Sequence, residues 1–339
     1  MDTERSTTKD TAAEDTGPET MHAVRLHAFG EPEQLVYEEV PRPEPGPGEV
    51  LVRVHAAGVN PPDWYARRGF ENLPVELRPD WKPPLVLGSD ISGTVVALGE
   101  GVTDWEPGDE VFGLVNFPGR AAGYAEYAVS PADHLARKPA GLGHVEAAAV
   151  PMAGLTAHQL VFRHLAGSPG DTVLVNGAAG GVGHFAAQLA KVAGARQVIG
   201  VASGRHGRFL TDLGVDRFVD YTRTPAEEVV RDADLLIDTV GGPDAHRLLP
   251  TVRRGGRIAP VFLGDYHREH AAALGITLNE RPWQVRSSGA DLAELAALLD
   301  SGRVRVGIDS VYPLRRAADA HRRAEQGHLQ GKIVLRVTA

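Results

Sequence analysis

The 339-residue sequence contains no cysteine. Disulfide bonds, thiolate nucleophiles and cysteine-ligated metal sites are therefore excluded. Long apolar runs are missing as well, since no segment approaches the roughly 20 residues of a membrane-spanning helix. Basic residues are in deficit: 35 Lys and Arg against 44 Asp and Glu give a net charge of −9. This balance argues against nucleic acid or an anionic membrane as the main partner.

The first 20 residues almost lack large apolar side chains. They are charged and rich in Thr, so they cannot form a core, and they have no apolar stretch like that of a signal peptide. We expect a disordered tail over residues 1–20, a folded part that begins at Met21, and a cytoplasmic protein. The remaining length is sufficient for two domains.

Glycine and alanine are concentrated in one segment, NGAAGGVGHFAAQLAKVAGA, at residues 176–195. The glycine spacing is Gly177-x-x-Gly180-x-x-Gly183 with Gly181 inserted, which departs from the strict G-x-G-x-x-G pattern. An apolar run at 171–175 precedes it, and a helical pattern follows as far as Gly194. Backbone N–H groups between a strand and a helix start favour a bound phosphate. The alternative is a glycine turn that only lets helix and strand pack closely.

Four more apolar runs follow the glycine loop, mostly separated by helical segments, at residues 197–202, 216–221, 233–242 and 255–263. This alternation predicts an α/β fold with a doubly wound, Rossmann-type parallel sheet. Ligands of such sheets bind at the carboxyl ends of the strands, where the glycine loop lies. Dinucleotide binding therefore outweighs the packing-only interpretation.

The chain before and after this region has a different pattern of apolar and turn-forming residues. From Met21 to about residue 145, short alternating runs such as GEVLVRVHAAGVN are separated by clusters of Pro and Gly. Near the other end, DLAELAALLDSG predicts a helix and GKIVLRV a strand. We expect a β-rich domain built from both ends of the chain, with the nucleotide-binding domain inserted between them.

Seven motifs in order resemble the medium-chain dehydrogenase/reductase superfamily, in its zinc-free quinone oxidoreductase (zeta-crystallin-like) branch: AAGVNPPDW, LGSDISGTVVALGEGV, PGDEVFGL, AAAVPMAGLTAH, NGAAGGVGHFAAQLAK, DTVGG and GKIVL. The resemblance covers residues 21 to 337. It implies a GroES-like catalytic domain over residues 21–145 and 283–339 and a Rossmann NADPH-binding domain over residues 146–282. It also implies a homodimer, in which the apolar strand RIAPVFL extends a sheet across two subunits.

Zinc-bearing members of the superfamily resemble this chain but carry Cys at the position of Asn60 and a His-Glu pair at Ser89-Asp90. Asn and Ser are poor zinc ligands. The one close histidine cluster, His267 and His270 with Glu269, has no third ligand at metal-like spacing. We therefore expect no metal site.

Without a metal to polarise the substrate, the cofactor supplies the reactivity, and a quinone or an activated conjugated carbonyl suits as hydride acceptor. The resemblance places Asn60, Asp63 and Tyr65 at the nicotinamide end of the cleft. Tyr65 is expected to donate to the substrate oxygen and Asn60 to fix the ring or the substrate. The alternative is that Asp63 and Tyr65 only hold their loop. Further cofactor contacts implied by the resemblance are Thr156, Ala179, Gly180, Gly181, Val182, Val240, Phe262 and Leu263.

The end of the second strand indicates which cofactor is used. An NAD site normally places Asp or Glu there, but this chain has Ser203-Gly204-Arg205 and no acid before Asp212. Ser203 and Arg205 suit the 2′-phosphate of NADPH, and by resemblance so does Tyr221. The alternative is a solvated arginine in a surface turn.

The acceptor is less well defined. The loop Arg67–Leu85 is aromatic and is expected either to overhang the cleft with Phe70 and Trp81 or to be a surface elaboration. Phe117, Tyr124 and Trp283 are further candidates for the wall, with core packing as the alternative. Two other functions stay open: an enoyl reductase or tailoring enzyme of a biosynthetic pathway, and an NADPH-binding redox sensor without turnover.

We predict that the purified protein binds no catalytic zinc, because Asn60 and Ser89 replace good ligands and cysteine is absent. Metal analysis of the purified protein, with activity measured before and after dialysis against a chelator, tests this. Stoichiometric zinc on which activity depends would contradict the prediction.

Overall fold

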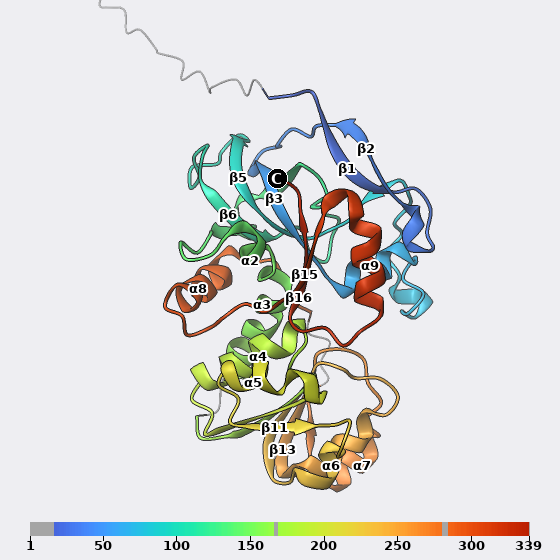
Figure 1. Ribbon diagram of the computed structural model, residues 1–339, viewed down its shortest axis with the longest axis vertical. Helices are drawn as coiled ribbons and strands as arrows, with labels where there is room; N and C mark the ends of the chain where they lie inside the picture. Colours follow the sequence, from blue (N-terminus) through green and yellow to red (C-terminus); the bar gives the residue numbers. More distant parts are fainter. Residues whose placement is uncertain (1–16, 166–168, 280–283, 339) are drawn as a thin grey trace, which may run out of the picture.

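The computed structural model describes residues 17–165, 169–279 and 284–338 (Figure 1). Its nucleotide-binding part is a parallel sheet of six strands in the order β11-β10-β9-β12-β13-β14. The strands are β9 (Thr172–Asn176), β10 (Gln197–Ala202), β11 (Arg217–Asp220), β12 (Ala233–Asp238), β13 (Val252–Pro260) and β14 (Thr277–Leu278). From β9 the chain runs outward to β11 and then returns to the other side as β12. The carboxyl ends of β9 and β12 therefore mark the topological switch point.

Helices flank this sheet on both sides because its strands are apolar on both faces. They are α4 (Gly181–Val192), α5 (Gly207–Asp212), α6 (Ala226–Val229) and α7 (Arg268–Ala273), with 3-10 turns η5 (Gly204–His206) and η6 (Ala245–Thr251). The buried face of α4 carries Phe185 and Leu189 at helical spacing. The predicted α/β class with a doubly wound parallel sheet is confirmed.

The β-rich part contains two sheets. The larger has the order β15-β16-β3-β5-β6-β8 with β7 paired to β3, and the smaller is β2-β1-β4. Their strands are β1 (Thr20–Leu26), β2 (Leu35–Pro41), β3 (Glu49–Val59), β4 (Leu85–Val86), β5 (Asp90–Leu98), β6 (Glu110–Leu114), β7 (Tyr127–Pro131), β8 (Leu135–Arg137), β15 (Ile308–Pro313) and β16 (Lys332–Arg336). Strands from both ends of the chain share the larger sheet, since β16 pairs with β3. This is the GroES-like fold that the sequence predicts.

The remaining elements lie between strands of the β-rich part or join that part to the parallel sheet. They are α1 (Pro61–Arg67), α2 (His144–Ala148), α3 (Pro151–His158), α8 (Gly289–Asp300) and α9 (Ala317–Glu325), together with the 3-10 turns η1 (Pro32–Gln34), η2 (Val75–Leu77), η3 (Ala132–His134) and η7 (Leu314–Arg316). A π-helical segment, η4 (Gln159–His164), continues α3 without a break. Figure 1 shows α3 and α8 at the level where the β-rich part meets the parallel sheet.

Several predicted boundaries differ from the structure. β12 ends at Asp238 rather than at residue 242, because Gly241 and Gly242 take positive φ angles of 63° and 89° in a turn. β13 ends at Pro260, three residues before the predicted end. The predicted disordered tail falls largely outside the described residues, and the domain division stays a prediction. No helix among the described residues is long and apolar enough to cross a membrane.

Candidate active site

The glycine loop forms a backbone cradle at the switch point. Gly177 has a φ of 74°, and Gly183 packs so closely on the Gly177 carbonyl that a side chain there would overlap it. Gly180, in extended conformation, precedes the 12-residue helix α4, whose first turn faces the loop. Close backbone approach and the positive end of a helix dipole together fit the pyrophosphate of a dinucleotide.

A cavity of about 740 Å³ lies between this loop and α1. Nine of the predicted site residues line it: Asn60, Asp63, Tyr65, Thr156, Gly180, Gly181, Val182, Val240 and Phe262. The ring of Tyr65 stacks on that of Phe262, with ring centroids 5.8 Å apart, so residues of both parts of the chain meet. The Tyr65 hydroxyl has no hydrogen-bond partner among the described residues and is left for a ligand.

The loop after α1 supplies an apolar wall of this cavity. Its contributions are Phe70, Leu73, Leu77 and Trp81, and Phe117 faces them from another loop. Of the two alternatives for this loop, these contacts favour the one in which it borders the cavity. Tyr124 does not line the cavity and is fully buried in the core, while Trp283 lies outside the described residues.

Asn60 is held in the floor of the cavity by two buried charged residues. Its Nδ2 donates to Asp90 Oδ2 at 2.8 Å, and its Oδ1 accepts from the ammonium of Lys332. Lys332 Nζ also donates to the Val59 carbonyl at 2.7 Å, and Asp90 Oδ1 accepts from the Met152 N–H at 2.8 Å. These contacts occupy much of the Asn60 amide, which is 1% exposed. The amide therefore links Asp90 to Lys332 at the floor of the cavity.

Burial shifts both of these charged groups toward their neutral forms. It raises the pKa of Asp90 and lowers the pKa of Lys332, and the attraction between the two groups opposes both shifts. Their nearest charged atoms lie 3.9 Å apart. Sequence reasoning missed Lys332. One signal was available in the sequence, because this lysine begins the apolar strand GKIVL. A lysine buried at such a position needs a charged or polar partner.

Asp63 works mainly as a structural cap. Its carboxylate accepts the Asn60 N–H at 2.8 Å, at the start of α1, and the Tyr124 hydroxyl at 2.9 Å. The Tyr124 hydroxyl also contacts His321 of α9 at 3.4 Å, and His321 accepts from Arg67 Nε at 3.3 Å. This chain of contacts holds α1 against α9. It supports the alternative that Asp63 holds its loop.

The three residues predicted for a 2′-phosphate lie together at the neighbouring ends of β10 and β11. Among the described residues, Ser203 Oγ is buried without a hydrogen-bond partner. Arg205 donates to the His328 carbonyl and, at 3.1 Å, to His206 Nε2. The Tyr221 hydroxyl lies 3.2 Å from His328 Nδ1. An unpartnered hydroxyl beside a guanidinium fits a phosphate group, and His328, which the sequence did not indicate, closes the cluster from the segment before β16.

Besides the three residues of the 2′-phosphate cluster, two predicted cofactor residues, Ala179 and Leu263, do not line the cavity. The Ala179 carbonyl accepts the Gly331 N–H at 2.8 Å, which joins the glycine loop to the start of β16. Leu263 is 60% exposed, and its carbonyl accepts from the Gly242 N–H at 2.9 Å. In this structure both residues make these hydrogen bonds through backbone atoms.

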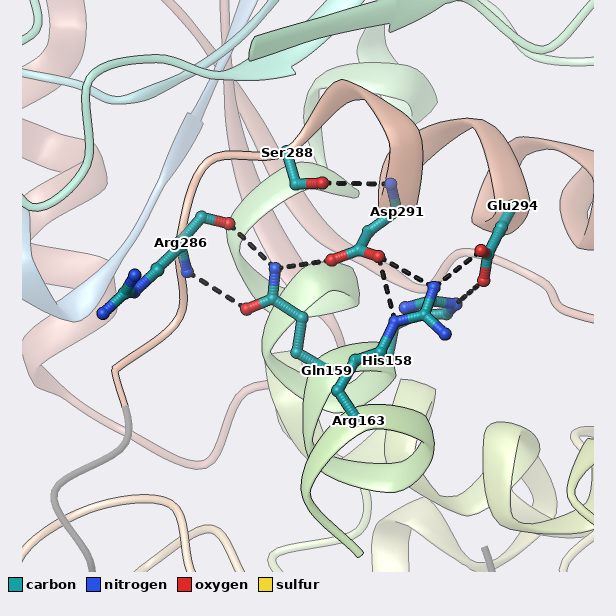
Figure 2. Close-up of polar contacts among 7 residues, drawn as sticks. All are labelled: His158, Gln159, Arg163, Arg286, Ser288, Asp291 and Glu294. Atoms are coloured by element: carbon teal, nitrogen blue, oxygen red, sulfur yellow. Dashed lines mark hydrogen bonds and ion pairs between the residues drawn. The ribbon is translucent and has the colours of Figure 1, made fainter. Parts of the chain in front are cut away.

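Among the described residues, His267, Glu269 and His270 do not form a group of close metal ligands. The His267 ring stacks on His246, with centroids 4.0 Å apart. Within the described ranges one group could offer three metal ligands, namely His158, Asp291 and Glu294. Arg163 already lies between the two carboxylates of that group, as Figure 2 shows, at 3.0 Å from Asp291 and 2.6 Å from Glu294. The cluster is thus a network of ion pairs.

Fold and site together define a nicotinamide-dependent oxidoreductase with a GroES-like catalytic part. Residues 46–140 match the model of the alcohol dehydrogenase GroES-like domain, and residues 213–335 match that of a zinc-binding dehydrogenase. The chain belongs to the medium-chain dehydrogenase/reductase superfamily, in its quinone-oxidoreductase-like branch.

Individual relatives agree with this placement. The chloroplast envelope quinone oxidoreductase homolog of Arabidopsis thaliana is 31% identical, over 93% of this chain and 98% of its own. The mitochondrial NAD(P)H oxidoreductase RTN4IP1 of Mus musculus is 32% identical, over 86% and 82%. The solved quinone oxidoreductase from Coxiella burnetii superposes with a TM-score of 0.81 at 31% identity, over 94% of this chain and 100% of its own.

We predict that Asp63→Asn makes the slope of stability against pH more positive than in wild type. Burial raises the pKa of Asp63 from 3.8 to about 7. Between those values the folded state holds a proton on this carboxyl that the unfolded state lacks, so Asp63 contributes stability that is lost as pH rises through this window. The neutral amide removes this contribution, and the slope should change by up to about 1.4 kcal/mol per pH unit.

Urea unfolding of both proteins at several pH values between about 4 and 7 measures this slope. The amide oxygen of the variant can still accept from the Asn60 N–H and the Tyr124 hydroxyl, so the cap is kept. Parallel curves for wild type and variant would contradict the raised pKa.

Proposed function

We propose that the protein transfers hydride from NADPH to a quinone or another conjugated carbonyl, without zinc. The observation that carries this proposal is the cavity, in which an unpartnered Tyr65 hydroxyl and the Lys332–Asn60 floor face the glycine loop. When bound, the cofactor supplies the hydride, and the protein has to place the acceptor.

The residues of the cavity suit such an acceptor. Hydride addition to a conjugated carbonyl moves negative charge onto its oxygen, where a hydrogen-bond donor lowers the barrier. Burial raises the pKa of Tyr65, so its hydroxyl stays protonated and able to donate. The buried Lys332 favours negative charge nearby, and the aromatic loop after α1 offers flat apolar contacts for a ring. Several relatives are named quinone oxidoreductases, which supports the same acceptor class.

The zinc-independent part of the proposal rests on the contacts of Asn60. Its side-chain nitrogen and oxygen are both hydrogen-bonded, to Asp90 and to a positively charged lysine. A divalent cation beside that ammonium would be repelled. An amide is also a weak zinc ligand.

The preference for NADPH over NADH rests on the cluster around Ser203. The orphaned hydroxyl, the Arg205 guanidinium and the Tyr221 hydroxyl offer donors to a phosphate. One acid does lie close by, because Asp220 at the end of β11 packs against Gly204. Its carboxylate already accepts from the N–H and the hydroxyl of Thr222, at 3.0 and 2.6 Å. Its other carboxylate oxygen lies 3.5 Å from Arg223 Nε, so Asp220 has a cation of its own and the proposal assigns the 2′-phosphate to Arg205.

Steady-state oxidation of NADPH with a panel of p-quinones, o-quinones and enones tests the activity. Turnover with quinones supports the proposal, and turnover confined to enones favours the alternative enoyl reductase or tailoring enzyme. Tight NADPH binding without turnover on any acceptor would favour the redox sensor.

We predict that Arg205→Ala weakens NADPH binding by about 10- to 150-fold and leaves NADH binding nearly unchanged, the loss expected for one charge-assisted hydrogen bond. Fluorescence titration with each cofactor measures both affinities. Arg208→Ala is the matched control, because that side chain is 95% exposed and lies three residues further on. Equal loss of both cofactors, or a wild type that prefers NADH, would refute this 2′-phosphate subsite.

We also propose a cytoplasmic homodimer. The apolar strand β13 was expected to extend the sheet across two subunits, and the structure covers part of its edge with the two-residue strand β14. A short edge strand of this kind still leaves most of the edge for pairing. Light scattering at micromolar concentration should give twice the chain mass of 36.1 kDa. A monomeric mass would contradict the dimer.

A further inference from the structure

Gln159, the first residue of η4, is buried at the junction between α3 and the segment that leads into α8. Its Oε1 accepts the Arg286 N–H at 3.1 Å, and its Nε2 donates to the Arg286 carbonyl at 2.9 Å (Figure 2). The same Nε2 donates to Asp291 Oδ2 at 2.9 Å. One side-chain amide thus satisfies both backbone polar groups of one residue on a distant segment, as a neighbouring strand would.

The π-helical turn explains why Gln159 can reach this position. The Leu165 N–H donates to the Leu160 carbonyl at 2.9 Å, five residues back. His158 at the end of α3 and Gln159 and Arg163 of η4 lie on the face toward α8, where Figure 2 shows them directed at Asp291 and Glu294. Such turns are uncommon and occur often at functional sites.

Gln188 of α4 makes the same clamp at the other end of α8. Its Oε1 accepts the Arg305 N–H at 2.8 Å, and its Nε2 donates to the Arg305 carbonyl at 2.9 Å. Gln188 is 4% exposed and Gln159 is 6% exposed, so both amides are cut off from water. The two clamps hold the segments that precede and follow α8.

The segment held by Gln159 belongs to the acceptor side of the cavity. Gln284 and Val285, directly before Arg286, line the cavity. The Phe117 N–H donates to Ser287 Oγ at 3.1 Å, so the same segment also holds the Phe117 wall. Ser288 then caps α8 by accepting the Asp291 N–H at 3.1 Å. Gln159 is therefore connected to two walls of the acceptor space.

The segment held by Gln188 belongs to the cofactor side. The Gly307 N–H, two residues after Arg305, donates to His184 Nε2 at 3.2 Å, and His184 Nδ1 lies 2.9 Å from the Gly180 carbonyl. Burial lowers the pKa of His184 to about 4, so the ring is neutral and Nδ1 carries its proton. The Lys332 N–H donates to the Gly307 carbonyl at 2.9 Å. Gln188 is therefore connected to the glycine loop and to the start of β16.

We propose that Gln159 and Gln188 are positioning residues with separate roles: Gln159 sets the acceptor wall and Gln188 sets the cofactor cradle. The assignment of the two sides rests on the proposed function. Neither glutamine touches the reacting atoms, and each acts through the backbone of an arginine that it clamps.

Gln159→Met and Gln188→Met test this proposal, because methionine keeps the length and volume of the side chain and removes its hydrogen bonds. Gln159→Met should raise KM for a quinone about tenfold and leave the Kd of NADPH within about twofold of wild type. Gln188→Met should raise the Kd of NADPH about tenfold and leave KM for the quinone within about twofold of wild type. Gln326→Met, at an exposed position after α9, is the control for the substitution itself and should change neither constant.

Both variants lose comparable buried hydrogen bonds, so their loss of stability should be similar and cannot by itself produce opposite effects. If both variants change KM and Kd in parallel, the glutamines are general structural residues and the proposal is wrong. The same conclusion follows if neither constant changes.

Amide hydrogen exchange gives a readout that does not need an acceptor. Exchange should accelerate over residues 284–292 in Gln159→Met and over residues 303–308 in Gln188→Met, each without the other. If wild type turns over no quinone, the proposed function fails, while exchange and the Kd of NADPH still test the positioning roles. If exchange accelerates over both segments in both variants, the two positioning roles are wrong.

Discussion

The buried ammonium of Lys332 is the constraint on which the rest of the site depends. Removing a charge from water costs several kcal/mol, so it must be paired and hydrogen-bonded where it lies. Its partners are Asp90, Asn60 and the Val59 carbonyl, which come from β5, from the start of α1 and from β3. Asp90 in turn accepts from the Met152 N–H of α3. Lys332 and its partner Asp90 thus fix the larger β-rich sheet against α3, which borders the cavity.

The two parts of the molecule meet through directed polar contacts as much as through apolar packing. Ala179 and Gly331, His184 and Gly307, and the two glutamine clamps all pair a group of the nucleotide-binding part with backbone of the segments around α8 and β16. Hydrogen bonds require a fixed distance and direction, whereas apolar contacts tolerate sliding. The cavity between the parts can therefore keep a defined shape.

Polar contacts between the two parts also occur at the proposed 2′-phosphate site. Ser203 and Arg205 follow β10, Tyr221 follows β11, and His328 comes from the segment before β16. Recognition of a phosphate would then draw on both parts of the molecule. Under the proposed 2′-phosphate site, selection of the cofactor would then be linked to the relative placement of the two parts.

The sequence alone determined the fold class and the location of the cofactor cradle. These depend on local patterns, namely apolar runs, their spacing and a glycine loop between a strand and a helix, and local patterns can be read along the chain. Tyr65, Thr156 and Phe262 could be assigned to the cavity only through the family resemblance, but their motifs were also local. The boundaries of β12 and β13 were less accurate, because turn geometry competes there with apolar character.

Tertiary structure decided which side chains complete the site. Asn60 and Lys332 are 272 residues apart in the sequence, and Gln159 and Arg286 are 127 apart. No periodicity or motif links positions so distant, and a buried lysine or glutamine looks like any surface residue until its partners are known. The contacts of Asp63 are also visible only in space, because its carboxyl accepts from the start of a helix and from Tyr124. Pairing of polar groups in the interior is a property of the folded chain, since only folding removes the water that would otherwise satisfy them.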